Sequence, residues 1–221
     1  MMKRTYVINA IAIAVAILMS ACGNSNSQQN NTPADDAGKI GEKVWMPKNL
    51  DVTTFRNGDP IKEAKTADEW KSAYENEEPA WCYYGNNPEN AEKYGVLYNW
   101  FAVKDSRGLC PEGWSIASEN DWKDLVNALG GGNTAGSAMK HTNEWNNDTD
   151  GENNSGFSAL PAGARDANGD FYGLNQTAIW WTSTEWIGNK ICTYVLEAGQ
   201  SYCIDYPAST DEGHAVRCVK N

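Results

Sequence analysis

A loop rich in carboxylate and amide side chains, residues 146–154, is the strongest candidate for a chemical site. It reads Asn-Asn-Asp-Thr-Asp-Gly-Glu-Asn-Asn, and Asp148, Asp150 and Glu152 alternate along it. Calcium takes about six to eight oxygen ligands, and this alternation resembles the opening of a calcium loop. The loop lacks the downstream bidentate Glu of an EF-hand, and Asn, Asp and Gly are also ordinary loop residues. Two interpretations follow, a calcium site at Asp148, Asp150 and Glu152 or a solvated loop.

Three tryptophans are candidates for ligand binding: Trp145, Trp181 and Trp186. Sugar rings stack on exposed indoles because their C–H faces match the aromatic π-face. Alternation along a strand would turn Trp180 and Trp181 to opposite faces, so that one packs in the core while the other is displayed. The simpler interpretation is that both indoles pack in a Trp-rich core. Trp145 and Trp186 are then the better candidates for exposure.

Cysteine usage is typical of an oxidising compartment, and no spacing indicates a zinc site. Cys192 and Cys203 flank a Glu-Ala-Gly-Gln turn, so a hairpin there would place them nearly opposite each other and predicts a disulfide. Cys110 and Cys218 would then form the long-range pair. Cys82 is left over, and we expect a buried free thiol.

The first residues of the chain predict export and lipid attachment. Lys3 and Arg4 precede an apolar run, and Leu-Met-Ser-Ala before Cys22 resembles the bacterial lipobox. We therefore expect a signal peptide over residues 1–21, acylation of Cys22 and a flexible linker over residues 22–39. Three acyl chains on one residue would hold the protein in the membrane. The expected location is the outer membrane, facing the periplasm or the cell surface.

The composition limits the classes of partner. The chain has 18 basic and 29 acidic residues, and removal of Lys3 and Arg4 with the signal leaves 16 against 29, a net charge of −13. Such acidity argues against a nucleic-acid partner. Residues 40–221 are long enough for one folded domain with a real core.

Two capping boxes predict helices that begin after Thr66 and Ser118. The first helix carries Trp70, Ala73 and Tyr74 on one face. The second has apolar residues at positions i, i+3, i+4 and i+7 and ends at a glycine triplet. A third short helix is expected over residues 98–104.

Short apolar runs separated by Gly, Asn and Asp predict antiparallel strands joined by long loops. The expected strands cover residues 45–50, 157–161, 179–182, 191–196, 202–206 and 215–219. The predicted fold class is therefore α+β, with two or three short helices packed on a small antiparallel sheet.

Six phrases, taken together and in order, resemble the Fibrobacter succinogenes major paralogous domain, a family of exported bacterial domains. They are Val-Trp-Met-Pro-Lys-Asn-Leu (residues 44–50), Trp-Cys-Tyr-Tyr (81–84), Tyr-Gly-Val-Leu-Tyr-Asn-Trp (94–100), Cys-Pro-Glu-Gly-Trp (110–114), Gly-Phe-Ser-Ala-Leu-Pro-Ala-Gly (156–163) and Val-Arg-Cys-Val (216–219). The resemblance implies a C-type lectin-like fold, related to that of formylglycine-generating enzymes. In that fold the chain ends meet and a disulfide ties the first helical region to the last strand, which implies the pair Cys110 and Cys218.

The resemblance implies more about fold than about function, because this scaffold hosts many activities. Lectins of the superfamily bind sugars through calcium, and the segment that begins at Trp145 is close to their Trp-Asn-Asp phrase. We expect a non-catalytic, lipid-anchored binding domain for a glycan or a protein partner. The alternatives are a purely structural envelope role and, less favoured, a carboxylate-based or redox enzyme. The spacing of Cys192 and Cys203 does not match the redox pair of formylglycine-generating enzymes.

Overall fold

The computed structural model describes residues 38–146 and 151–221, and within them the two longest helices begin at capping boxes. Thr66 Oγ1 accepts a hydrogen bond from Glu69 N, while Glu69 Oε2 accepts one from Thr66 N, and α1 (Ala67–Glu75) follows. Ser118 and Asp121 form the same reciprocal pair before α4 (Glu119–Ala128). Both exchanges satisfy amides that have no partner within the helix. The helices predicted from these boxes are confirmed.

The described residues contain more short helices than the two or three predicted: α2 (Ala91–Tyr94), α3 (Trp100–Val103), α5 (Ala135–Met139) and the 3₁₀ turns η2 (Tyr84–Asn86) and η3 (Pro88–Asn90). The helix predicted over residues 98–104 is shorter than expected, because residues 97–99 form a strand. Asn99 makes the change from strand to helix. Its side-chain oxygen accepts hydrogen bonds from Ala102 N, as an N-cap, and from Ala80 N on the neighbouring strand.

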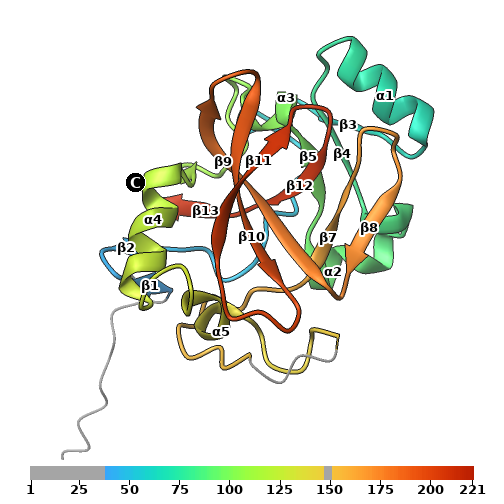
Figure 1. The fold of residues 1–221 in the computed structure, drawn as a ribbon. Coiled ribbons are helices and arrows are strands. Elements are labelled where there is room, and N and C mark those ends of the chain that lie inside the picture. Colours follow the sequence, from blue (N-terminus) through green and yellow to red (C-terminus); the bar gives the residue numbers. More distant parts are fainter. Residues whose placement is uncertain (1–37, 147–150) are drawn as a thin grey trace, which may run out of the picture. The chain divides into compact units, whose positions relative to one another are not determined.

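The main sheet is mixed, so the prediction of a small antiparallel sheet was wrong. Its nine strands are β3 (Lys62–Glu63), β4 (Ala80–Cys82), β5 (Leu97–Asn99), β7 (Ala162–Arg165), β8 (Phe171–Leu174), β9 (Thr177–Trp186), β10 (Lys190–Glu197), β11 (Ile204–Ser209) and β12 (Gly213–Val216). Their order is β11-β10-β9-β7-β12-β5-β4-β3, with β8 paired to β7 (Figure 1). The β7–β9, β9–β12 and β3–β4 pairs are parallel. In each pair at least one other element lies between the two strands in sequence and returns the chain to the same end of the sheet: β8, then β10 and β11, and α1.

Two small ribbons join the two ends of the described domain. They are β1 (Lys39–Ile40) with β2 (Lys43–Val44), and β6 (Trp114–Ile116) with β13 (Cys218–Lys220). Trp45 bridges Val219, and Met46 N donates to Cys218 O at 3.0 Å. Lys39, which we assigned to the linker, is therefore the first residue of β1.

Two of the predicted strands are wrong, and prolines mark both places. Residues 45–50 contribute only the Trp45 bridge, and Pro47 has no N–H to donate to a ladder. Residues 157–161 contribute only a bridge from Ala159 to Lys140, and β7 begins after Pro161. The other predicted strands coincide in part with β9 to β13, and the run 215–219 is interrupted at Arg217.

An aromatic cluster fills the core between α4 and the sheet. Trp122 stacks on Tyr194, with ring centroids 5.0 Å apart and planes 10° apart. Trp45, Phe157 and Trp180 surround Trp122, at centroid distances of 5.1, 5.5 and 5.3 Å. Each such pair contributes about 0.5–1.5 kcal/mol beyond the burial of its area. The cluster fixes the position of α4 on β9 and β10.

A buried arginine ties this cluster to the segment before β3. Arg217 is 1% exposed, and its guanidinium lies 4.2 Å from the ring centroid of Phe157. It donates to the carbonyl oxygens of Met46 and Phe157 at 2.8 Å and to Asn49 Oδ1 at 2.9 Å. Burial lowers the pKa of Arg217 to about 9. The side chain thus satisfies three buried oxygens at once.

Candidate functional site

A groove of about 580 Å³ lies between the end of α1, the helix α3 and the tip of the β9–β10 hairpin. In Figure 1 this hairpin tip and α3 lie at the top of the domain. The groove is lined by aromatic and charged side chains together with small polar ones: Tyr74, Glu75, Glu77, Trp100, Phe101, Lys104, Glu185, Trp186, Gly188, Asn189, Lys190, Ile191, Ser209 and Thr210. Trp186, one of the three tryptophans predicted to bind a ligand, is part of this lining.

Tyr74 and Phe101 form one aromatic part of the lining. Their ring centroids lie 6.0 Å apart, and Tyr74 is 38% exposed whereas Phe101 is buried. Lys104 is the residue that follows α3, and its Nζ lies 4.7 Å from the Phe101 ring centroid. Tyr74 therefore packs near the buried Phe101 ring and is still partly exposed.

Trp186 forms a second aromatic part of the lining, and its ring is held in one orientation. It is half-buried against the main core, and its Nε1 donates to Glu119 Oε2 at 3.0 Å. Glu119 also pairs with Lys123, with 2.6 Å between Oε1 and Nζ. Lys123 foremost, and then Trp186, hold the pKa of Glu119 below its usual value. The indole is thus held by the ionised carboxylate of Glu119, the first residue of α4.

The tip of the hairpin that carries Trp186 is built from turn residues. Trp186 pairs with Lys190, so Ile187, Gly188 and Asn189 form the loop. Gly188 has φ 78° and Asn189 has φ 59°, a left-handed conformation that these two residue types adopt at low cost. A register shift in β9–β10 follows the tip, and such bulges increase the local twist. Ile187 is fully exposed at the tip.

The polar lining of the groove offers both signs of charge and neutral hydrogen-bonding groups. Glu75, Glu77 and Glu185 supply carboxylates, whereas Lys104 and Lys190 supply ammonium groups. Hydroxyl and amide groups come from the three remaining polar side chains in the lining. Anchored rings together with many donors and acceptors are the features that a hydroxyl-rich ligand requires.

The other two tryptophans proposed as ligand contacts are buried, which contradicts that part of the prediction. Trp181 is fully buried between Trp100 and His214, and its Nε1 donates to Tyr98 O at 2.8 Å. Trp145 is 6% exposed. Trp180 is buried as well, so the interpretation of a Trp-rich core is confirmed for residues 180 and 181. Only Trp186 of the three candidates reaches a described cavity.

The predicted calcium ligands are only partly described. Asp148 and Asp150 lie outside the described residues, as do Cys22 and the signal peptide. Glu152 is exposed, and its Oε2 accepts a hydrogen bond from Asn154 Nδ2 at 2.7 Å. Within residues 38–146 and 151–221, no three His, Cys, Asp or Glu side chains gather as a metal site.

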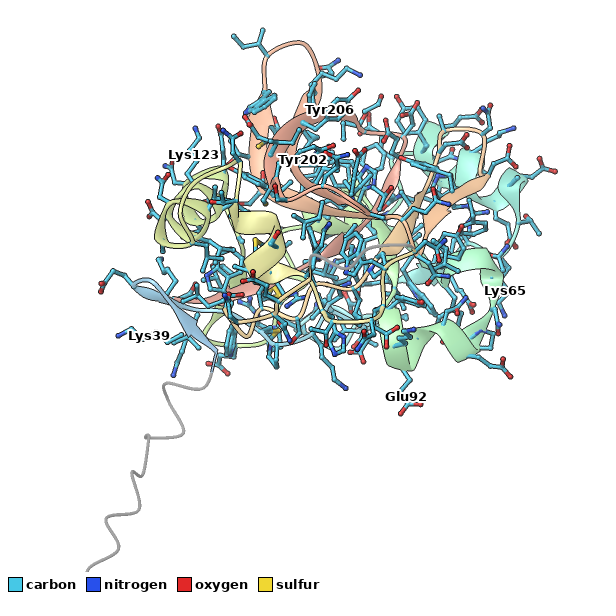
Figure 2. The ribbon with its side chains drawn as sticks, turned by 60° about the horizontal axis from the view of Figure 1, so that its bottom comes forward. Lys39, Lys65, Glu92, Lys123, Tyr202 and Tyr206 are labelled. Carbon is cyan, nitrogen blue, oxygen red and sulfur yellow. A yellow bond between two sulfur atoms is a disulfide. The ribbon has the colours of Figure 1, made fainter. Side chains whose placement is uncertain are left out.

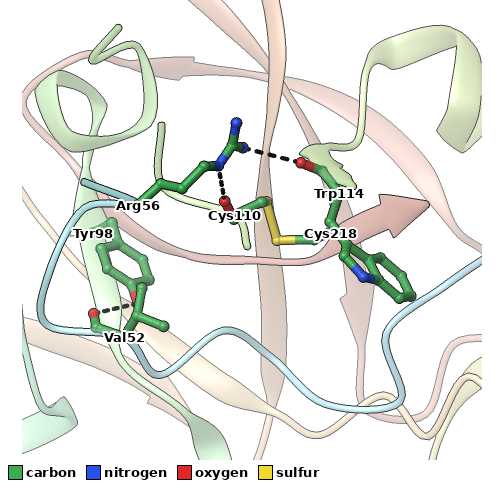
Figure 3. Close-up of a disulfide and its surroundings, with 6 residues drawn as sticks. All are labelled: Val52, Arg56, Tyr98, Cys110, Trp114 and Cys218. Atoms are coloured by element: carbon green, nitrogen blue, oxygen red, sulfur yellow. Dashed lines mark hydrogen bonds between the residues drawn. A yellow bond between two sulfur atoms is a disulfide. The ribbon is translucent and has the colours of Figure 1, made fainter. Parts of the chain in front are cut away.

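The long-range disulfide is confirmed. Cys110 and Cys218 are bonded across 108 residues of sequence and tie the segment before β6 to β13 (Figure 3). Arg56 supports this region from outside, because its guanidinium donates to Cys110 O at 3.0 Å and to Trp114 O at 3.2 Å. The bridge and Arg56 together hold the loop before β6 against the body of the domain.

The disulfide predicted between Cys192 and Cys203 is wrong, because the hairpin has a different register. Val195 pairs with Ile204, and Cys192 therefore lies opposite Pro207 rather than Cys203. Cys192, Cys203 and Cys82 are all buried free thiols. The expectation for Cys82 is confirmed.

Sequence patterns missed most of the groove. Tyr74 was placed on the buried face of α1 with Trp70 and Ala73, and those two are buried whereas Tyr74 is not. Its position next to the last residue of α1 was the available signal. Lys104 and Lys190 carried no signal, since isolated lysines are typical of any surface.

Comparisons with known proteins agree with the resemblance seen in the sequence. The family model of the Fibrobacter succinogenes major domain matches residues 39–220. Neither a curated protein nor a solved structure matches the chain. No helix in the described part of the chain is long and apolar enough to cross a membrane. With nearly all of the folded region matched by that model, the chain belongs to the Fibrobacter succinogenes major domain family.

Proposed function

We propose that this protein is a lipid-anchored binding domain of the cell envelope that recognises a glycan or a protein partner without catalysis. The observation that carries the proposal is the groove, in which Trp186 and Tyr74 offer aromatic surface beside charged and hydroxyl groups. Of the two ligand classes the groove favours a glycan, because sugar rings use stacking and multiple hydrogen bonds together.

The anchor and the location of the protein are part of the same proposal. Cys22 after an apolar run is the basis for acylation and for an outer-membrane location facing the periplasm or the cell surface. The Cys110–Cys218 bridge supports exposure to an oxidising compartment.

We further propose that the fold is of the C-type lectin-like class, which formylglycine-generating enzymes share. Three features support this assignment. The two ends of the domain meet at the Trp45–Val219 bridge, a disulfide reaches the last strand, and two capped helices accompany a mixed sheet. The calcium site at Asp148, Asp150 and Glu152 belongs to the same proposal.

A purely structural envelope role is the second candidate, and the burial of Trp145 and Trp181 favours it. Those two rings stabilise the fold and offer nothing to a ligand. The two roles differ in one respect that can be measured, since only a binding domain loses affinity when exposed groove residues are removed.

The test is a binding screen of the full-length protein against cell-wall and dietary polysaccharides, with calcium and with EDTA. Trp186→Ala and Tyr74→Ala should each weaken binding about tenfold or more. Tyr202→Ala is the matched control, because Tyr202 is a partly exposed tyrosine on the loop before β11 and does not line the groove. It should bind as the unmodified protein does.

The outcomes separate the proposals. Loss of binding in EDTA would support the calcium site, whereas binding that resists EDTA but fails in Trp186→Ala would assign recognition to the groove alone. Equal binding by all three variants would exclude the groove. Absence of binding to every polysaccharide would leave a protein partner or the structural role.

A further inference from the structure

Three of the five large apolar side chains that stand exposed among the described residues lie on one face of the main sheet. They are Tyr172, Ile204 and Tyr206, which are 41%, 40% and 59% exposed. None of the three lines the groove described above. We call this surface the tyrosine face, and Tyr206 on it is labelled in Figure 2.

The register of the strands brings these side chains together. Tyr172 on β8 pairs with Ala164 on β7, and Ile204 on β11 pairs with Val195 on β10. Val195 in turn pairs with Ile179 on β9. Ala164, Ile179 and Val195 pack as one small cluster, so a single row of side chains runs across five strands. Paired residues share a face of the sheet, which places all of the row on one side.

Two carboxylates lie at one end of this face. Gly213 pairs with Arg165 across β12 and β7, and Glu212 and Asp166 are the next residues outward on these strands. Two contacts fix Glu212. Its Oε1 accepts a hydrogen bond from Ser209 N at 3.1 Å, and its Oε2 lies 3.1 Å from Nε2 of His214 on β12. Burial alone would raise the pKa of Glu212, but the histidine contact and the Ser209 hydrogen bond outweigh it and hold the pKa below its usual value.

The carboxylates and the rings are close enough to affect one another. The pKa of Tyr172 is raised to about 12, first by burial and then by the charges of Glu212, Asp166 and Tyr206. Asp166 is held as well, because its Oδ1 accepts hydrogen bonds from Asn168 N at 2.8 Å and from Asp170 N at 2.9 Å. The tyrosine face therefore combines two exposed phenol rings with two neighbouring carboxylates that are both fixed in place. A cation gains from both features, because it is attracted by an aromatic π-face and by a carboxylate.

We propose that the tyrosine face binds a basic segment of a partner protein, with a lysine or arginine side chain lying across Tyr172 and Tyr206 and its charged end at Glu212 and Asp166. The row between the exposed side chains is buried, so the aliphatic stem of the partner's side chain would contact Tyr172, Ile204 and Tyr206, while the carboxylates suit its charge. The chain as a whole has a net charge of −11, so a basic segment is also attracted at longer range. Its exposed side chains do not line the groove, although Glu212 is hydrogen-bonded to the groove residue Ser209, so the tyrosine face adjoins the groove and adds a second binding function.

The test uses the full-length protein and a fluorescein-labelled tetralysine peptide, with tetraglutamate as the peptide of opposite charge. Binding is followed by fluorescence anisotropy at about 50 mM salt, where the Debye length is longer than 10 Å. Glu212→Gln and Tyr206→Ala should each weaken tetralysine binding about tenfold. Tetraglutamate should not bind.

Glu92→Gln is the matched control, because it removes the same charge from a side chain that Figure 2 shows at the opposite side of the domain from Tyr206. It should change the affinity less than about twofold. The unfolding temperature of each variant shows that it folds. Equal weakening by Glu92→Gln and Glu212→Gln would mean general attraction to an acidic protein and would overturn the proposal. Unchanged binding by Tyr206→Ala, or no tetralysine binding, would overturn it too.

Discussion

Two single residues, Arg217 between β12 and β13 and Asp121 in the first turn of α4, hold distant parts of this fold together. Arg217 donates to oxygens of Met46, Asn49 and Phe157, all of them neutral groups. Such a cation is stable in the core only because each of these hydrogen bonds is charge-assisted. Removal of the guanidinium would leave several buried acceptors without a donor, which costs about 1–3 kcal/mol for each.

We therefore expect Arg217→Met to lower the free energy of unfolding by about 3 kcal/mol or more, measured by urea denaturation. Arg217→Lys should also be destabilising, because an ammonium group cannot reproduce the planar fork. Lys71→Met on the exposed side of α1 is the control and should change stability by less than about 0.5 kcal/mol. A mild effect of Arg217→Met would show that the site collapses around an apolar side chain.

The N-terminal cap of α4, in which Asp121 takes part, should lose stability in acid. Burial alone would raise the pKa of Asp121, but hydrogen bonds from Ser118 and the ion pair with Lys43 outweigh burial and hold the pKa below its usual value. Between the native and the unfolded pKa the unfolded state binds more protons, so stability falls as the pH falls through this window. The contribution is complete above the unfolded value of about 3.9.

Asp121→Asn should therefore cost about 1 kcal/mol at pH 7, and this difference from the unmodified protein should shrink as the pH approaches 3. Urea denaturation at both pH values measures it. Asp124→Asn, at an exposed position of the same helix, removes an equal charge without touching the cap. A difference that persists unchanged at pH 3 would mean that ionisation of Asp121 does not matter.

At the scale of elements, the helix α5 depends on a glycine that lies against another backbone. A Cβ at Gly136 would lie 2.3 Å from Tyr202 O and 2.7 Å from Ser201 O. Gly136→Ala should therefore separate α5 from the loop after β10 and cost about 1–3 kcal/mol in unfolding experiments. Gly132→Ala is the matched control, because its Cβ would meet Cys203 O at an ordinary 3.5 Å.

The capped helices were predictable, whereas the sheet was not. Local hydrogen bonds between Thr66 and Glu69, or between Ser118 and Asp121, are encoded within four residues. Parallel pairing of β9 with β12 depends on chain segments far apart, and nothing in a short window encodes it. The register of β10 and β11 likewise depends on a distant segment, because the loop over residues 198–203 is longer than the expected turn and hydrogen-bonds to Gly132 and Gly136. The sequence alone therefore placed Cys192 opposite the wrong residue.

The candidate site was only partly predictable for a related reason. Trp186 follows the polar residues Ser-Thr-Glu and precedes turn residues, so exposure could be expected from the pattern. Trp181 lies in an apolar run, where a strand could display it or bury it, and rings from β12 and α3 cover it in the folded chain. Burial by distant segments decides which aromatic rings remain available to a ligand.

At the scale of the whole molecule, one covalent link closes most of the domain. Cys110 and Cys218 are 108 residues apart, and a loop of that length corresponds to about 4–5 kcal/mol in the chain-entropy model. The double variant Cys110→Ala/Cys218→Ala should lose about that amount in urea denaturation. Addition of dithiothreitol should destabilise the unmodified protein and leave the double variant unchanged. Equal sensitivity of both proteins to the reductant would contradict this role.

The three buried free thiols have a consequence for how the correct bridge is selected. Burial foremost raises the pKa of Cys82 to about 11 and that of Cys192 to about 12, and it raises the pKa of Cys203 as well. Thiol–disulfide exchange needs an accessible thiolate, which none of the three provides in the folded protein. In an unfolded or misbridged chain the same thiols are exposed and reactive. A chain with a wrong disulfide therefore keeps reactive thiols and can still rearrange. Once the Cys110–Cys218 bridge has formed and the chain has folded, the three free thiols of the described residues are buried and can no longer exchange with it.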